Sequence, residues 1–103
     1  MTTNKEFEIR RDNAVARAIA YSSTFIAERA ENAEIWDVEG KRYIDFCGGI
    51  VCQNTGHRND RVVSAIKQQL DSLTHTCFQV TPYESYITLA ERLIPVARKA
   101  DSL

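Results

Sequence analysis

Two short apolar runs near the middle of the chain, at positions 35–38 and 43–46, have the composition of β-strands. They consist largely of β-branched and aromatic residues, which suit a half-buried pleated surface. Between them, Gly40 can adopt the positive φ that a tight reversal needs. We therefore predict a hairpin that pairs residues 33–38 with 42–46. The pair Gly48-Gly49 follows directly and predicts a sharp bend.

An N-terminal helix is predicted by Thr3 and Glu6, which have the spacing of a capping box. Such a box satisfies backbone N–H groups that the first helical turn leaves without partners. We therefore expect a helix from Lys5 towards Ala16. The polar residues 21–24 then predict a connector that leads into the hairpin.

Two more helices are predicted after the glycine pair. Asn59 or Asp60 can cap the first, in which apolar residues recur every three or four positions. These residues are Val62, Val63, Ile66, Leu70 and Leu73. The sequence Thr81-Pro82-Tyr83-Glu84 predicts the start of the second helix, with proline at its first position. We expect Pro95 to disrupt that helix near its end, because proline lacks an N–H and crowds the preceding turn.

These elements predict an α+β fragment in the order helix, hairpin, loop, helix, loop, helix. At 103 residues the chain is one small domain at most, or a piece of a larger one. Two strands are too few for an independent sheet, and the helices have apolar stripes that need a partner surface. The arrangement is typical of the edge of a larger protein.

Composition narrows the class of partner. Hydrophobic residues make up 44% and charged residues 26% of the chain, which is typical of a soluble globular protein. The formal net charge of −1 favours neither nucleic acid nor an anionic membrane surface as a partner. No apolar run approaches the ~20 residues that cross a bilayer. The N-terminus lacks the apolar core of a secretory signal, so we expect a cytoplasmic protein.

The cysteines and histidines raise the alternative of a zinc site. Three cysteines cannot all pair within one chain, and no Cys-x-x-Cys pair occurs. The spacing of the five soft ligands fits no structural zinc pattern. These ligands are Cys47, Cys52, His57, His75 and Cys77. We expect no metal site and interpret the cysteines as buried, reduced thiols.

The order of several short motifs resembles that of the class III aminotransferases. The motifs are Asp37 to Gly40, Tyr43-Ile44-Asp45-Phe46, Gly48-Gly49, Gly56-His57, Val62-Val63-Ser64-Ala65-Ile66 and Leu73-Thr74-His75. Within that family, residues 54–57 and 75–79 look most like those of bacterial 4-aminobutyrate aminotransferases. The resemblance runs from about Asn4 to Ile94, which is about the first quarter of a typical member. The chain departs from many relatives at Asn59-Asp60, where they have His-Pro.

The resemblance implies the N-terminal part of a fold-type-I enzyme that depends on pyridoxal phosphate. In such an enzyme a lysine holds the cofactor as a Schiff base. The resemblance further implies that the amino group of 4-aminobutyrate passes to 2-oxoglutarate and that the enzyme is a homodimer. None of the four lysines in this chain lies in the family's catalytic motif. We therefore expect no catalytic and no cofactor-binding residue here, and the chain alone should be inactive. Residues 1–57 would belong to the small domain, and residues 58–103 would lead into the large domain.

Two residues of the chain are candidates for substrate binding. By its position after the glycine pair, Ile50 matches a residue that lines the substrate channel in the family. Gln79 lies in a loop that approaches the active-site entrance in relatives. Without the resemblance they would be interpreted as a core isoleucine and a solvent-facing glutamine. His57 and His75 are expected to order loops by hydrogen bonding and not to act as acid–base groups.

Two alternative functions stay open. The enzyme could act on ornithine or N-acetylornithine, which keeps the family and changes the substrate. The short chain could also be a truncated product without activity, acting as an interaction or structural piece.

Overall fold

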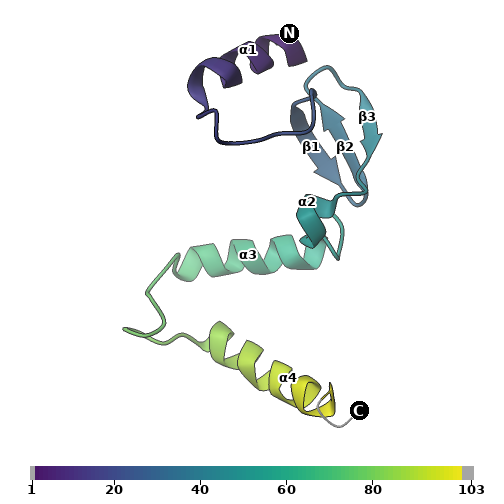
Figure 1. Cartoon of the computed structure of the whole chain (residues 1–103). Coiled ribbons are helices and arrows are strands. Elements are labelled where there is room, and N and C mark those ends of the chain that lie inside the picture. The colour runs from purple at the N-terminus through teal and green to yellow at the C-terminus, as the bar shows by residue number, and fades with distance from the viewer. Residues whose placement is uncertain (1, 101–103) are drawn as a thin grey trace. The chain divides into compact units, whose positions relative to one another are not determined.

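The computed structural model describes residues 2–100, with side chains to residue 98. In it the chain forms two compact units, which meet in the sequence between Ser64 and Ala65. The described residues form seven elements in succession (Figure 1). They are α1 (Asn4–Ala14), β1 (Ala27–Glu31), β2 (Glu34–Asp37), β3 (Arg42–Ile44), α2 (Gly48–Val51), α3 (Asp60–Ser72) and α4 (Glu84–Ala100). The predicted mixture of helices and a small antiparallel sheet is confirmed.

Helix α1 begins with the predicted capping box. The Glu6 N–H donates to the Thr3 hydroxyl at 3.2 Å, and the Thr3 N–H donates to a carboxylate oxygen of Glu6 at 2.7 Å. The helix ends at Ala14, two residues before the predicted limit. Residues 15–26 then connect it to the sheet without regular structure.

The predicted hairpin is confirmed, and the structure adds a third strand. β2 pairs antiparallel with β3, with Ile35 opposite Tyr43, and β1 pairs antiparallel with the other edge of β2. The turn from β1 to β2 passes through Asn32, whose φ of 50° is tolerated by asparagine. The polar sequence of β1 lacks the apolar alternation of a strand, so its pairing with β2 and the stacking of Arg29 on Trp36 determine its conformation.

The bend at Gly48-Gly49 is confirmed, but it extends further than predicted. All four residues of α2 have positive φ, from 51° to 66°, so this turn differs from a right-handed helix. Glycine adopts such angles at no steric cost, whereas the β-branched Ile50 and Val51 adopt them rarely. The backbone of this turn is therefore strained at Ile50 and Val51, whereas the sequence predicted only a sharp bend at the glycine pair.

The predicted α3 is confirmed, with Asn59 as its cap. The side-chain oxygen of Asn59 accepts from the N–H groups of Arg61 and Val62 at 3.2 and 3.3 Å. Helix α4 begins at Glu84 and not at Thr81-Pro82, because Thr81 belongs to a preceding turn in which its N–H donates to the carbonyl of Cys77.

The expectation that Pro95 disrupts α4 is wrong. Helix α4 continues through Pro95 to Ala100. Proline removes one N–H donor from the helix, and the turns on either side retain theirs, so the loss stays local.

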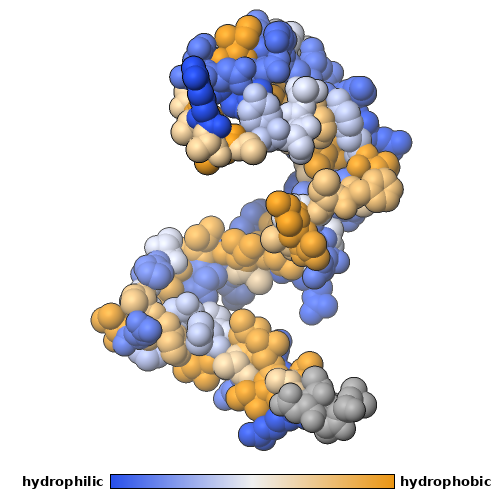
Figure 2. Space-filling view, viewed as in Figure 1, coloured by the Kyte–Doolittle hydropathy of each residue, from blue (hydrophilic) through white to orange (hydrophobic). Residues whose placement is uncertain are grey.

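The described residues include no buried apolar side chain. Large apolar residues of α3 and α4 are exposed, among them Leu70 at 58% and Leu93 at 55%, and Figure 2 shows such hydrophobic side chains open at the surface of both helices. Asp37 is the one buried residue among those whose burial is described, at 1% exposure. In the described part of the chain the strands of the sheet make the only extensive contacts between elements. The apolar stripes therefore remain uncovered within each unit.

Candidate functional site

The first organised polar centre surrounds Asp37, at the end of β2. One carboxylate oxygen accepts from the backbone N–H groups of Glu39 and Lys41 at 3.0 and 2.9 Å. The other accepts from the Asn4 amide at 3.0 Å and from the Tyr43 hydroxyl at 2.9 Å. Four donors therefore satisfy this buried carboxylate.

The Asp37 centre connects α1 to the sheet. The side-chain oxygen of Asn4, on α1, also accepts from the N–H of Ile26 at 2.7 Å, just before β1. The ring of Phe25 stacks on Tyr43 with their centroids 4.1 Å apart. Burial raises the pKa of Asp37, but the hydrogen bonds from Asn4, Lys41, Tyr43 and Glu39 outweigh it and lower the pKa overall. The carboxylate is thus held charged and fully engaged, which suits a structural role and leaves no oxygen free for proton transfer.

The second polar centre surrounds Asp45, which follows β3. One carboxylate oxygen accepts from the N–H groups of Cys47 and Gly48 at 3.0 and 2.9 Å. The other lies 2.7 Å from Nε2 of His57, and the side chain of Asp45 is 6% exposed. The hydrogen bond with His57 lowers the pKa of Asp45, the N–H groups of Gly48 and Cys47 act in the same direction, and burial opposes them.

The backbone of His57 is also attached to the sheet. His57 and Asn32 exchange two backbone hydrogen bonds, at 2.8 and 3.0 Å, which join the loop after α2 to the β1–β2 turn. The neighbouring Gly56 has φ +78°, and a Cβ there would lie 3.0 Å from the Cα of Asn32. Glycine is therefore required at position 56 for this close approach.

The Asp45 centre borders a hollow of about 310 Å³. Most of its lining residues have polar side chains, and they come from the β1–β2 turn, from Asp45 and from residues 48–56. The lining residues are Asn32, Ala33, Asp45, Gly48, Gln53, Asn54, Thr55 and Gly56. Both oxygens of Asp45 are already engaged, so this hollow presents fixed hydrogen-bonding groups and no free base.

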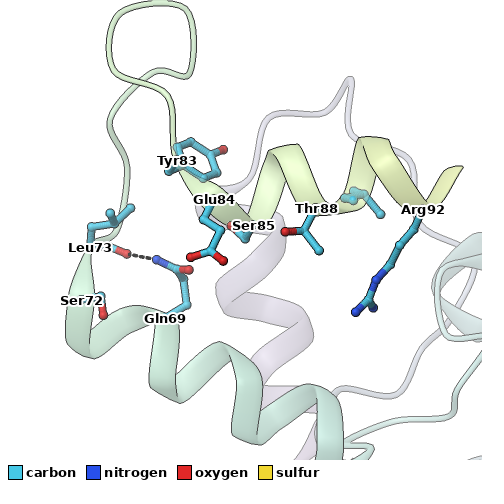
Figure 3. A pocket seen from close by; sticks show the side chains of 9 residues that line it. Gln69, Ser72, Leu73, Tyr83, Glu84, Ser85, Thr88 and Arg92 are labelled. Carbon is cyan, nitrogen blue, oxygen red and sulfur yellow. Dashed lines mark hydrogen bonds between the residues drawn. The ribbon is translucent and has the colours of Figure 1, made fainter. Parts of the chain in front are cut away.

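A second hollow, of about 510 Å³, lies between α3 and α4 in the second unit. Figure 3 shows the side chains of Gln69 and Glu84 turned toward each other across it, with Thr88 and Arg92 further along α4. The amide of Gln69 donates to the carbonyl of Leu73 at 3.2 Å. The residues that line this hollow include no cysteine, histidine or lysine.

The two predicted substrate-binding residues are both at the surface. Ile50 lies in α2 and is 87% exposed. Gln79 is exposed in the turn of residues 78–80, before α4. Ile50 belongs to the first unit and Gln79 to the second. In the described part of the chain, Ile50 has no packing partner of the kind that a core residue would have.

The expectation of buried thiols is wrong for all three cysteines. Cys47, Cys52 and Cys77 are free and exposed, because the described residues form no apolar core that could enclose them. Within the same residues, no three side chains of histidine, cysteine, aspartate or glutamate lie close enough together to hold a metal ion. No described helix is long and apolar enough to cross a membrane.

The sequence did not lead us to predict these polar centres as sites, and Asp45 was expected only as part of the strand of residues 42–46. The sequence nevertheless contains a turn motif at both Asp37 and Asp45. Aspartate at the first position of a turn accepts hydrogen bonds from backbone N–H groups further along. Asp37 stands three residues before Gly40, and Asp45 stands three residues before Gly48. The predicted role of His57 in ordering a loop is confirmed by its contacts with Asp45 and Asn32.

Comparison with known proteins gives the family. The profile of the class III aminotransferases matches residues 16–103. The 5-aminovalerate aminotransferase DavT of Pseudomonas aeruginosa is 52% identical over 91 residues, and the 4-aminobutyrate aminotransferase GabT of Escherichia coli is 50% identical over 91 residues. Each alignment covers 88% of this chain and 21% of the relative.

A solved structure agrees with the sequence comparison. The taurine:2-oxoglutarate aminotransferase of Bifidobacterium kashiwanohense, in complex with pyridoxal phosphate and glutamate, superposes with a TM-score of 0.77 at 28% identity. The match covers 94% of this chain and 22% of that enzyme. The chain belongs to the class III aminotransferase family, whose members depend on pyridoxal phosphate, and spans about a fifth of the length of the relatives it matches.

The described lysine side chains lie outside the two hollows. A Schiff base needs a lysine in a pocket. Lys5 is paired with Glu8 at 2.7 Å, and Lys41 lies over the ring of Tyr43 at 5.1 Å. Lys67 is exposed on α3, and no lysine lines either hollow described above.

Proposed function

We propose that this chain is part of an aminotransferase that moves the amino group of 4-aminobutyrate to 2-oxoglutarate, giving succinate semialdehyde and glutamate. The observation that carries the proposal is the 50% identity to a 4-aminobutyrate aminotransferase over 88% of the chain. We further propose that the complete enzyme is a cytoplasmic homodimer and that residues 1–57 belong to its small domain. Residues 58–103 would then lead into its large domain.

Within that enzyme, the contribution of this chain would be shape and not chemistry. Ile50 presents an uncovered apolar side chain on a strained turn, which suits contact with the methylene groups of the amino donor. Gln79 presents an exposed amide, which suits a polar contact at the entrance of the site. Both carboxylates of the polar centres are fully hydrogen-bonded, so they support this scaffold without taking part in proton transfer.

A second candidate donor is 5-aminovalerate. The relative named for that activity is 52% identical to the chain, against 50% for the one named for 4-aminobutyrate. The two donors differ by one methylene group. An apolar pocket distinguishes such a pair by a factor on the order of 10 to 200 in kcat/KM.

The experiment is a donor profile of the complete polypeptide that contains this chain. It would be purified with pyridoxal phosphate and assayed with 2-oxoglutarate and four donors, namely 4-aminobutyrate, 5-aminovalerate, ornithine and N-acetylornithine. We expect the highest kcat/KM for 4-aminobutyrate, followed by 5-aminovalerate. A higher value for ornithine or N-acetylornithine would overturn the proposed substrate. No transfer from any donor would support the alternative of a structural chain.

A further inference from the structure

Residues 46–56 form a compact surface loop whose two ends lie together. Asp45 stands immediately before the loop and His57 immediately after it, and their side chains meet at 2.7 Å. Loops of this form, with close ends and 6–16 residues, are often functional. The Asp45–His57 pair therefore holds together the two ends of the loop that contains α2 and Ile50.

Both ends of this loop are attached to the sheet. Asp45 follows β3 directly, and His57 is bridged to Asn32 by two backbone hydrogen bonds. The close approach at Gly56 brings the end of the loop against the β1–β2 turn. In Figure 1 the loop around α2 accordingly lies at the end of the sheet where the β1–β2 turn is found. The loop thus starts and ends at the three-stranded sheet of the first unit.

The same carboxylate also holds the start of α2. The oxygen of Asp45 that does not face His57 accepts from the N–H groups of Cys47 and Gly48. Ile50 follows two residues later with φ 58° and ψ 63°, a conformation that a β-branched residue adopts only when its surroundings impose it. Strained backbone of this kind is concentrated at functional sites.

We propose that Asp45 and His57 are positioning residues that hold the strained Gly48–Val51 turn so that Ile50 discriminates between amino donors of different chain length. This inference rests on the proposed function and adds residues that determine its specificity. Neither side chain needs to touch the substrate. His57 holds the carboxylate of Asp45, the carboxylate holds the N–H groups of Cys47 and Gly48, and these fix the turn that carries Ile50.

The test compares four variants of the complete polypeptide by the ratio of kcat/KM for 4-aminobutyrate to that for 5-aminovalerate. His57→Ala removes the partner of Asp45, whereas His57→Gln retains an N–H donor at similar reach. Asp45→Asn removes the charge and leaves one oxygen, which can accept from the two N–H groups or from His57 but not from both, so the link between His57 and the turn is lost. Glu34→Gln is the matched control, because it removes a carboxylate that contacts Arg42 at 2.7 Å in the same sheet.

We expect His57→Ala to lower the ratio about tenfold, the discrimination that one methylene supplies in an apolar pocket. His57→Gln should restore it to within about twofold, and Glu34→Gln should leave it unchanged. Amide exchange of a peptide that covers residues 46–57 should be faster in His57→Ala than in the parent enzyme. If His57→Ala does not fold, Asp45→Asn should shift the ratio in the same direction.

An unchanged ratio in His57→Ala, or in Asp45→Asn if that variant is needed, would overturn the inference. An equal shift in Glu34→Gln would also overturn it, because the effect would then follow general stability. A parent enzyme that uses neither donor would instead refute the proposed function, so the two failures are distinguishable.

Discussion

Replacing Ile50 by alanine is the most informative single change in this chain. The side chain of Ile50 is 87% exposed and has no packing partner in the described residues. A core isoleucine would lose stability on truncation, because alanine leaves a cavity. Ile50→Ala removes no internal contact of this kind and relieves a β-branched residue from a positive φ. We therefore expect the variant to lose activity in the complete enzyme without losing stability.

The size of the loss follows from the atoms removed. Truncation of isoleucine to alanine deletes three carbons, and each buried CH₂ contributes about 0.8 kcal/mol, which sets an upper limit of about 2.4 kcal/mol. The methylene chain of an amino donor covers only one side of the residue. We therefore expect a loss of about 1–2 kcal/mol, or about tenfold in kcat/KM for 4-aminobutyrate. Ile50→Tyr should change the ranking of donors, because it alters the shape of the pocket.

The assay is steady-state kinetics for 4-aminobutyrate and ornithine, with the melting temperature and the cofactor content measured alongside. Val51→Ala is the matched control, since Val51 is also β-branched, 78% exposed and at positive φ. We expect the control to change kcat/KM by less than about twofold. If Ile50→Ala and Ile50→Tyr keep the donor ranking and kcat/KM and lower only the melting temperature, Ile50 is a core residue of the complete enzyme and the reasoning is refuted.

Of three further predictions, two concern the isolated chain and the third concerns Asp45 in the complete enzyme. No described lysine lines either of the two hollows, so pyridoxal phosphate followed by borohydride should label several surface lysines of the isolated chain, each only in part. A stoichiometric adduct at one lysine, mapped by mass spectrometry, would contradict this prediction. Because its apolar side chains are uncovered, the isolated chain should either self-associate, as measured by light scattering, or be weakly ordered, as measured by circular dichroism. A monomer with a sharp cooperative melt would contradict this prediction. The pKa of Asp45 is lower in the folded chain, so its stabilising effect is present above the unfolded value and lost as the pH falls through the folded value. Amide protection of Gly48 should therefore decline below about pH 4 in the parent and show no such decline in Asp45→Asn.

Local signals predicted much of the fold because they act within a few residues. The capping box at Thr3 and Glu6, the reversal at Gly40 and the cap at Asn59 each depend on neighbouring backbone groups. Strand β1 could not be predicted in this way. Its residues, Ala27 to Glu31, have no apolar alternation, and their conformation comes from pairing with β2.

The candidate site was harder to predict than the fold, because its contacts join residues far apart in the sequence. The resemblance to a family suggested Ile50, but it gave no indication of the positive φ there. The role of Asp45 depends on His57, twelve residues later, and the role of Asn4 depends on Asp37. Turn chemistry at Asp45 could have been inferred from the following glycine pair, whereas the bridge from His57 to Asn32 becomes visible only in three dimensions.

An exchange of segments tests the central claim most directly. The claim is that this chain supplies scaffold and substrate-channel shape to a 4-aminobutyrate aminotransferase, whose cofactor chemistry comes from outside the described residues. In the E. coli enzyme GabT, the 91 residues that align with this chain would be replaced by their counterparts here. We predict a dimer that binds pyridoxal phosphate and retains kcat/KM for 4-aminobutyrate to within about tenfold, since 50% of the exchanged residues are identical. A folded chimera that is loaded with cofactor and does not transfer the amino group of 4-aminobutyrate would contradict the claim.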